Sequence, residues 1–418
     1  MKKYMNILMA ITSVAAFMSC SPEFSNGTSD IDSWPDVGET HVYTHPCMLH
    51  TADDITRVKA KVESNAQPWK IGYDALVEDV NINYTPNAKE TVNRANGDDP
   101  STDAEMAYRL ALMWRLTDDT KYADAAINIL NAWARTNKTI KSSAGDEVIS
   151  AGYSGYKYAN AAELVRGYEG WTTEDFDAFK AWMTDVVNPV CYEYLARHKG
   201  EDPKGAWLSW DVPAMASVLS IGILCDDDEK VNFVIKYFKE GAGSGCIENA
   251  VVAMHTDPAG HIQGAHLAQS METSREMGHA MTTVTAYGYV CQMAYNIGED
   301  LFAYNENRVL DICEYLAKYN VDPTDATIDM PFTPYDTVKE GWKSSIGQND
   351  VSQRGQICWG YELIYNHYKK LKNANPYYSR EYARTMRPEG HGIDYGTLMY
   401  TLDPVEAGED IKAVPERK

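Results

Sequence analysis

The chain has few cations for its number of acids, and it has no long apolar segment beyond its first twenty residues. Lys and Arg number 38 against 60 Asp and Glu, which gives 418 residues a formal net charge of −22. This charge argues against nucleic acid as a partner, because a phosphate backbone binds basic surfaces. No stretch after Met18 reaches the roughly 18 unbroken apolar residues of a membrane span.

Paired cysteines are also missing. Seven cysteines follow Cys20, at positions 47, 191, 225, 246, 291, 313 and 358. An odd number at irregular spacings, without a CxxC pair, indicates neither a disulfide framework nor a zinc site. We expect most of them to be small buried hydrophobic residues and predict no metal site and no cofactor.

The N-terminus has the pattern of a secretory signal. Two lysines at 2–3 precede an apolar run at 5–18, which ends at Ser19-Cys20. The run is too short for a stop-transfer helix. The string AFMSC resembles a bacterial lipobox, whose cysteine becomes the lipidated first residue, whereas the alternative is a plain signal peptide. We expect an exported lipoprotein anchored through Cys20, in the periplasm or at the outer membrane, with the cell surface included.

The composition divides the rest of the chain into three parts. Residues 21–40 are rich in Ser, Asp, Gly and Pro, so they bury too little surface to offset their ordering entropy and are predicted to be a flexible tether. Residues 41–405 contain no internal linker and are predicted to be one catalytic domain. Residues 406–418 form a polar tail.

Helical periodicity dominates the predicted domain. Apolar residues recur three and four apart in most of the domain. Polar or glycine-containing breaks at 226–228 and 296–298 separate the helical segments, and only 376–402 is strand-like or irregular. These features predict an all-α fold of the α/α type, although periodicity alone does not distinguish a bundle, a solenoid and a toroid. The absence of a fixed-period repeat counts against a solenoid. The periodic segments are 104–115, 122–134, 174–197, 207–224, 230–239, 275–297, 301–319 and 356–371.

Tyrosine and tryptophan outnumber phenylalanine, with 28 Tyr and 10 Trp against 8 Phe. Amphipathic aromatic residues suit a sugar-binding surface because they stack and hydrogen bond together, although large helical cores use them as well. Trp207 and Trp210 are three apart, so they could stack on sugar rings or fill the core.

The stretch QSMETSREMGH carries the densest set of chemical groups. If a helix begins there, Glu272, Arg275 and His279 fall at i, i+3 and i+7 on one face, which Tyr287 continues. Gly278 beside the histidine leaves room for a close approach. An acid, a guanidinium and an imidazole on one face can bind a carboxylate and move a proton. A surface salt bridge with a capped histidine is an equally good interpretation.

This stretch resembles a hallmark of the alginate lyase superfamily. ETSREMGH, then an apolar helix and NIGEDLFAYNENRVL, is similar to the family's E-S-G-R-D-Q-G-H and G-x-D-L-Y-x-Y-x-x-N-R-L segments. Glu272, Arg275, Gly278 and His279 match, whereas the residues at 273, 274, 276 and 277 depart from the commonest version.

Further strings resemble the family in the same order. HPCMLHTADDITRVKAKV with QPW looks like its HPGLLH…PW motif, and YADAAINILNAWA and ANAAELVRGY look like its ILNAW and ANAAEL helices. YELIYNHY and YGTLMYTL look like its late helix and tail, and the match covers about 45–402. The resemblance implies an α/α toroid that splits acidic polysaccharides without a catalytic metal.

The implied reaction is a β-elimination on a uronate. Such an enzyme must neutralise the carboxylate, remove the weakly acidic C5 proton and protonate the departing O4. Arg275 is the candidate for neutralisation because its planar fork suits a carboxylate. His279 is the candidate base, since an ordinary histidine has a pKa near 6.5.

The amide and the acid are less well marked in the sequence. WLSWDVPAMA has Ser209-Trp210 where the family usually has an Asn-Trp pair, so Asn160 is a substitute for the neutralising amide; a buried helix hydrogen bond is its alternative. The family implies a tyrosine acid, which can also act as the base. We prefer Tyr153 and then Tyr156, in the Gly-flanked segment AGYSGYKYAN, which is read as a loop; Tyr287 and Tyr361 remain candidates.

A histidine-rich segment, HTDPAGHIQGAH, supplies a competing base. His255, His261 and His266 are six and five residues apart, which does not place them on one helix face as in HExxH. We therefore expect a loop that borders the cleft and bonds sugar hydroxyls, with Gln263 among its binding residues and His266 as the competing base.

These observations predict a lyase acting on a uronate polymer, with alginate first and glucuronan or a similar polymer as the alternative. Two rivals remain. An α/α glycoside hydrolase needs two carboxylates, for which Glu163 and Glu272 are conceivable. A non-catalytic surface glycan-binding lipoprotein needs none. The oligomeric state is left open.

Overall fold

The computed structural model describes residues 38–274, 277–322, 329–335, 354–371, 373–390, 392–393 and 395–402. All of them belong to the second of two compact units, Pro35–Lys418. The predicted leader with Cys20, nearly all of the tether, the polar tail and Arg275 lie outside the described residues.

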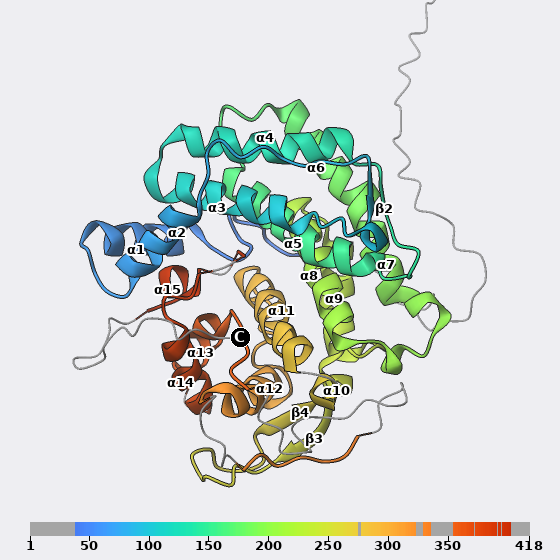
Figure 1. Ribbon diagram of the computed structural model, residues 1–418, viewed down its shortest axis with the longest axis vertical. Helices are drawn as coiled ribbons and strands as arrows, with labels where there is room; N and C mark the ends of the chain where they lie inside the picture. The colour runs from blue at the N-terminus through green and yellow to red at the C-terminus, as the bar shows by residue number, and fades with distance from the viewer. Residues whose placement is uncertain are drawn as a thin grey trace, which may run out of the picture. The chain divides into compact units, whose positions relative to one another are not determined.

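Helices make up most of the described chain, and two small sheets accompany them (Figure 1). The first half contains α1 (Ala52–Glu63), α2 (Trp69–Asp79), α3 (Ser101–Thr117), α4 (Thr120–Thr136), α5 (Glu147–Val165), α6 (Thr173–Trp182), a π-helical turn η3 (Met183–Val187), α7 (Asn188–Arg197), α8 (Leu208–Leu224) and α9 (Asp228–Glu240). The second half contains α10 (Ile247–Ala250), a 3₁₀ turn η6 (Met271–Ser274), α11 (Met277–Asn296), α12 (Tyr304–Asn320), α13 (Tyr361–Tyr368), α14 (Tyr377–Met386) and α15 (Gly396–Met399).

The two sheets are short. β1 (Thr91–Asn93) pairs in parallel with β2 (Thr139–Lys141). β3 (Val251–His255) pairs antiparallel with β4 (Leu267–Ser270), with a register shift near Val251, and the histidine-rich segment is the loop between them. Strands of three to five residues are too short to show an alternating pattern, so helical periodicity did not predict them.

Side-chain caps fix where several helices begin. Thr51 and Asp54 form a capping box at α1, in which each side chain accepts a hydrogen bond from the other's backbone N–H. Thr172 caps α6, and Asp227, which lies within the predicted polar break, caps α9. These caps satisfy backbone donors that the helices leave unpaired.

Two glycines let α5 lie unusually close to the buried helix α8. A Cβ on Gly152 would stand 3.2 Å from the backbone of Pro213, and one on Gly155 would stand 2.0 Å from Ser217 Oγ. The prediction of a loop at AGYSGYKYAN is therefore wrong. Its glycines allow close helix packing within α5, and they do not interrupt the helix.

Most of the helices follow one another around a ring that surrounds α11 in the view of Figure 1, and the first and last members of the ring meet. A Cβ on Gly72 of α2 would lie 2.8 Å from the backbone nitrogen of Leu398 in α15. Trp69 Nε1 and an Arg57 guanidinium nitrogen each donate to the Thr401 carbonyl at 3.0 Å. The N-terminal helices thus hold the C-terminal turn in place.

The N-terminal segment is tied to the far end of α5. His45 Nδ1 lies 2.6 Å from Glu163 Oε1, and its Nε2 lies 2.8 Å from Asp226 Oδ1. Burial opposes the charged ring, but its hydrogen bonds with Cys47 and Glu163 raise the pKa of His45 to about 10. A charged histidine therefore joins this segment to α5.

The predicted helical segments agree with the structure. The prediction that 376–402 is strand-like or irregular is wrong, because this stretch contains the helix α14 and the short helix α15. Within the part of the chain that the structure describes, no helix combines the length and apolar character that crossing a membrane requires. The seven cysteines after Cys20 are free, and all but Cys225 are buried, as expected.

Candidate active site

A cavity of about 170 Å³ lies between α5 and α11. Tyr153, Tyr156 and Lys157 line it from α5, where their spacing of three and four residues puts them on one helix face. Thr282 lines it from α11, and Trp359 lies in the segment before α13. We call this space the α5–α11 cavity.

Tyr153 has the environment of a proton donor. Its hydroxyl donates to the Ser209 carbonyl on α8 at 3.1 Å. Burial raises the pKa of Tyr153 to about 12, and a hydrogen bond with Thr282 only partly opposes this. The phenol is therefore neutral at physiological pH and carries a proton that it can deliver.

Glu272 holds the Ser209 peptide in place, and the carbonyl of that residue accepts the Tyr153 hydrogen bond. Its side chain is fully buried, and Oε1 accepts hydrogen bonds from Ser209 N at 3.0 Å and Ser209 Oγ at 2.8 Å. The expected helix through Glu272 is not observed. The residue lies in η6, where Thr273 Oγ1 bonds the Ser270 carbonyl, and α11 begins only at Met277.

Lys157 is a cation of this cavity that was not predicted from the sequence. Its Nζ pairs with Glu105 Oε1 at 2.5 Å, and Arg109 lies 3.5 Å from the other oxygen of Glu105. Lys157 supplies the positive charge among the described residues that line the α5–α11 cavity. A helical reading of AGYSGYKYAN would have found it, because Lys157 lies four residues after Tyr153.

His279 lies in the first turn of α11, one turn before Thr282. Its side chain is half-buried, and Thr282 Oγ1 donates to its backbone carbonyl at 2.8 Å. His279 therefore lies on the helix that forms one wall of the cavity, but it is not among the residues that line the cavity. Arg275, four residues earlier, is outside the described residues.

Three other predicted residues are engaged inside the core. Asn160 Oδ1 accepts from Leu49 N at 3.2 Å, and its Nδ2 donates to the Tyr156 carbonyl at 2.8 Å, which matches the alternative of a buried hydrogen bond. The hydroxyls of Tyr287 and Tyr361 both donate to backbone carbonyls, and both rings are almost fully buried.

Gln263 and His266 lie together in a different place. They line a cavity of about 310 Å³ beside α12, which we call the α12 cavity. His266 Nδ1 is 3.1 Å from Asp311 Oδ1, and burial raises the pKa of Asp311 to about 6. Of the predicted site residues, Tyr153 and Tyr156 thus line the α5–α11 cavity, whereas Gln263 and His266 line the α12 cavity.

Comparisons with known proteins decide the family. The alginate lyase family model matches residues 54–326. The chain belongs to the alginate lyase family. No curated protein matches its sequence.

Solved structures agree with the fold of this lyase. An alginate lyase from Bacteroides ovatus is 13% identical, with a TM-score of 0.54 and coverage of 86% of this chain and 100% of the other. Alginate lyase A1-III from Sphingomonas species A1 is also 13% identical, with a TM-score of 0.51 and the same coverage. These likenesses establish the α/α toroid predicted from the sequence, and family membership makes the protein a polysaccharide lyase.

The three histidines of the histidine-rich segment, His255 at the end of β3 and His261 and His266 in the β3–β4 loop, do not converge in the lyase. His255 Nε2 bonds Gln269 Oε1 at 3.0 Å, and the His261 ring stacks on Tyr377 at 4.1 Å between centroids. His266 pairs with the aspartate of α12 instead. Each of the three rings contacts a different partner, so the three histidines do not form one cluster.

The two tryptophans of the lyase differ in exposure. Trp207 is buried, whereas Trp210 is partly exposed and its ring lies 6.0 Å from that of Tyr194. Tyr194 in turn lines an open cavity of about 520 Å³ together with Lys141 and Lys199. Trp210 therefore keeps the surface position that a sugar-stacking role requires, while Trp207 packs in the core.

Proposed function

We propose that this polysaccharide lyase cleaves a uronic-acid polymer, with alginate as the first substrate, by β-elimination at the α5–α11 cavity. The product is a 4,5-unsaturated uronate end. The observation that carries the proposal is a neutral, partly buried tyrosine beside a lysine in a cavity of an alginate lyase family member. A tyrosine acid and a cation are two of the groups that the reaction needs.

Tyr153 is assigned the role of acid. When the C4–O4 bond breaks, the electron pair goes to O4, which takes the hydroxyl proton of Tyr153. Its bond to the Ser209 carbonyl directs the hydroxyl, and the contacts between Ser209 and Glu272 fix that peptide. Glu272 is thus a positioning residue that acts through Ser209.

Other residues are assigned to neutralise the substrate carboxylate and to remove the C5 proton. Lys157 is assigned to the substrate carboxylate, since a charge-assisted hydrogen bond stabilises the anion that forms when C5 loses its proton. Arg275 and the base His279 keep the roles that the sequence predicts. Because the net charge is −22, these local cations are required for a polyanion to bind.

The decisive assay measures the ultraviolet absorbance of the unsaturated product. Alginate, its two homopolymers, glucuronan and glycosaminoglycans are offered in turn to the purified protein. We expect absorbance to rise with alginate. New reducing ends without absorbance would mean hydrolysis, and binding without either signal would mean a glycan-binding protein.

Independence from metal ions is part of this proposal. The groups assigned above are all amino-acid side chains, so turnover is expected to survive EDTA. Loss of turnover that added calcium or zinc restores would overturn the metal-free mechanism.

Export as a lipoprotein is proposed from the N-terminal pattern alone. Wild-type protein is expected to fractionate with membranes through a lipid on Cys20, whereas Cys20→Ala is not. Equal fractionation of the two proteins would refute the anchor.

A further inference from the structure

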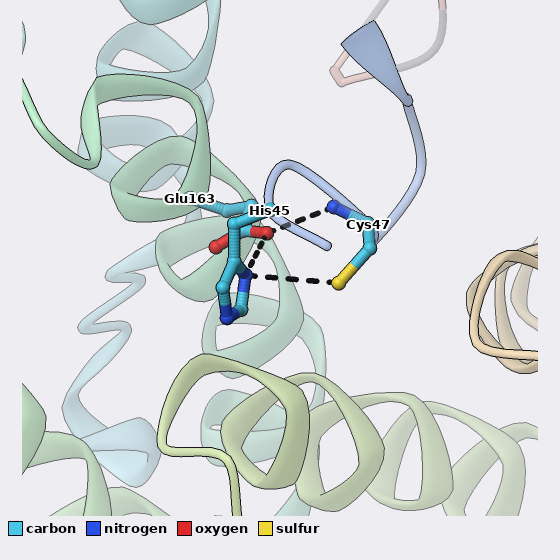
Figure 2. Close-up of side chains that lie close together, drawn as sticks. All are labelled: His45, Cys47 and Glu163. Atoms are coloured by element: carbon cyan, nitrogen blue, oxygen red, sulfur yellow. Dashed lines mark hydrogen bonds and ion pairs between the residues drawn. The ribbon is translucent and has the colours of Figure 1, made fainter. Parts of the chain in front are cut away.

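A second cluster of chemical groups lies where the N-terminal segment crosses the end of α5 (Figure 2). His45, Cys47 and Glu163 offer one nitrogen, one sulfur and one oxygen that all lie within 4.8 Å of one another. Cys47 Sγ is 3.6 Å from His45 Nδ1, which is 2.6 Å from Glu163 Oε1. None of these residues lines the α5–α11 cavity.

The surroundings of the cluster match those of a metal site. The second ring nitrogen of His45 is bonded to Asp226, and metal-binding histidines commonly use their other nitrogen in this way. Arg166 Nε donates to Glu163 Oε2 at 2.9 Å, which leaves Oε1 facing the histidine and the cysteine. Cys47 and Glu163 are buried, whereas the side chain of His45 is 17% exposed, so an ion can reach the cluster from the side of His45.

The distance between the sulfur and the nitrogen also suits a tetrahedral ion. With Zn–S of about 2.3 Å and Zn–N of about 2.0 Å, sulfur and nitrogen lie about 3.5 Å apart, close to the 3.6 Å between Cys47 and His45. The contact between His45 and Glu163 is a hydrogen bond, so it must open by about 0.7 Å to admit the ion. A small rotation of the partly exposed imidazole can supply this change.

The charges remain balanced when the ion enters. Both ring nitrogens of His45 face carboxylate oxygens, so both carry protons. The imidazolium and Arg166 then offset Glu163 and Asp226. Entry of a divalent ion displaces one proton from His45 Nδ1 and one from the Cys47 thiol, which leaves the net charge of the cluster unchanged.

We propose that His45 Nδ1, Cys47 Sγ and Glu163 Oε1 bind one zinc-like divalent transition-metal ion, with a fourth position open to water. A mixed nitrogen, sulfur and oxygen set favours zinc over calcium or magnesium, which prefer oxygen ligands alone. The ion joins the N-terminal segment to α5 and takes no part in turnover. Glu163 follows Tyr153 by ten residues on α5, which is roughly 15 Å along the helix axis.

The spacing of cysteines along the chain does not reveal this cluster. Its ligands stand at 45, 47 and 163, and the supporting aspartate stands at 226. Cys47 also occupies the position of glycine in the HPGLLH motif that this segment resembles, so the thiol is a feature of this chain.

Metal binding is tested on the full chain after EDTA treatment and removal of the chelator. Cobalt(II) serves as the first probe, because a thiolate ligand produces a sulfur-to-metal charge-transfer absorption. We expect one equivalent of cobalt to produce this band and one equivalent of zinc to abolish it. Calorimetry with zinc in buffers of different ionisation enthalpy should show the release of about two protons per ion.

Two variants and one control localise the site. Cys47→Ser should remove the band. Asp226→Asn keeps all three ligands but replaces the charged acceptor of the His45 Nε2–H with a neutral amide, which should weaken zinc binding about 10–100-fold. Cys225→Ser is the matched control, since that thiol contacts Thr184 and the change leaves the cluster intact.

Two results would overturn the proposal. One is a wild-type protein that shows no band at stoichiometric cobalt, and the other is a Cys47→Ser protein that keeps the wild-type band. If Cys47→Ser fails to fold, the affinity of Asp226→Asn and the proton count on wild-type protein decide. Lyase activity is scored separately, so failure of the metal site leaves the proposed reaction untouched.

Discussion

The two halves of α5 serve different ends of the molecule. The first half presents Tyr153, Tyr156 and Lys157 to the α5–α11 cavity. The second half turns Asn160 and Glu163 toward the N-terminal segment, where backbone N–H groups bind both side chains. One helix therefore joins a reacting face to an anchoring face, and substitutions in the two halves should have opposite effects on turnover and stability.

The largest effect is expected for Tyr153→Phe. Loss of the proton donor should lower kcat about 10²–10⁴-fold, because general acid catalysis contributes that much. The fold should persist, since the lost contact is one bond to the Ser209 carbonyl. Steady-state kinetics on the best polymer measures this. His266→Ala in the α12 cavity is the control, and a large loss there with a mild one for Tyr153→Phe would move the chemistry to the α12 cavity.

Lys157→Met should have the next largest effect on turnover. Removal of a charge-assisted hydrogen bond costs about 1.5–3 kcal/mol, which corresponds to roughly 10–100-fold in kcat/KM. Lys157→Arg keeps the charge and should retain more activity. If both variants turn over normally, the lysine serves only its ion pair with Glu105.

In the second half of α5, Glu163→Gln should lower stability and spare turnover. The carboxylate is buried and binds His45, Arg166 and the Cys47 N–H, so its loss leaves partners unpaired at a cost of about 3–5 kcal/mol. Denaturant unfolding with EDTA present measures this cost. A folded variant with unchanged stability but poor turnover would contradict the division of α5.

Asn160→Ala separates two roles for one amide. As a buried hydrogen-bonding residue, Asn160 should cost about 1–3 kcal/mol of stability when it is removed, with turnover within a few-fold of wild type. As the neutralising amide considered from the sequence, it should lower kcat sharply while stability changes little. Unfolding and kinetics on the same preparation distinguish these outcomes.

The smallest expected effect is that of alkaline pH on kcat. Because burial raises the pKa of Tyr153 to about 12, the acid stays protonated well above the ordinary tyrosine value of 10. We therefore expect kcat to show no alkaline fall through pH 10. A fall centred near 10 that disappears in Tyr156→Phe would transfer the acid role to the second tyrosine.

The helices could be predicted well from the sequence because their apolar periodicity is strong. The prediction failed where the role of a residue depends on how its helix packs against another helix. Gly152 and Gly155 suggested a loop, yet they are the points where α5 touches α8, and this error hid Lys157 on the face of Tyr153. The division of site residues between two cavities, and the cluster at His45, depend on contacts between distant segments that no local pattern records.

The meeting of the first and last helices also bears on how the chain acquires its fold. Arg57 and Trp69 bind the carbonyl of Thr401, more than three hundred residues away, so these bonds form only after almost the whole chain has been made. Contacts of such long sequence separation close late and slow folding. A nascent chain therefore stays open until its last turn emerges, and a truncation of only a few tens of residues at the C-terminus would leave α1 and α2 without the surface against which they pack.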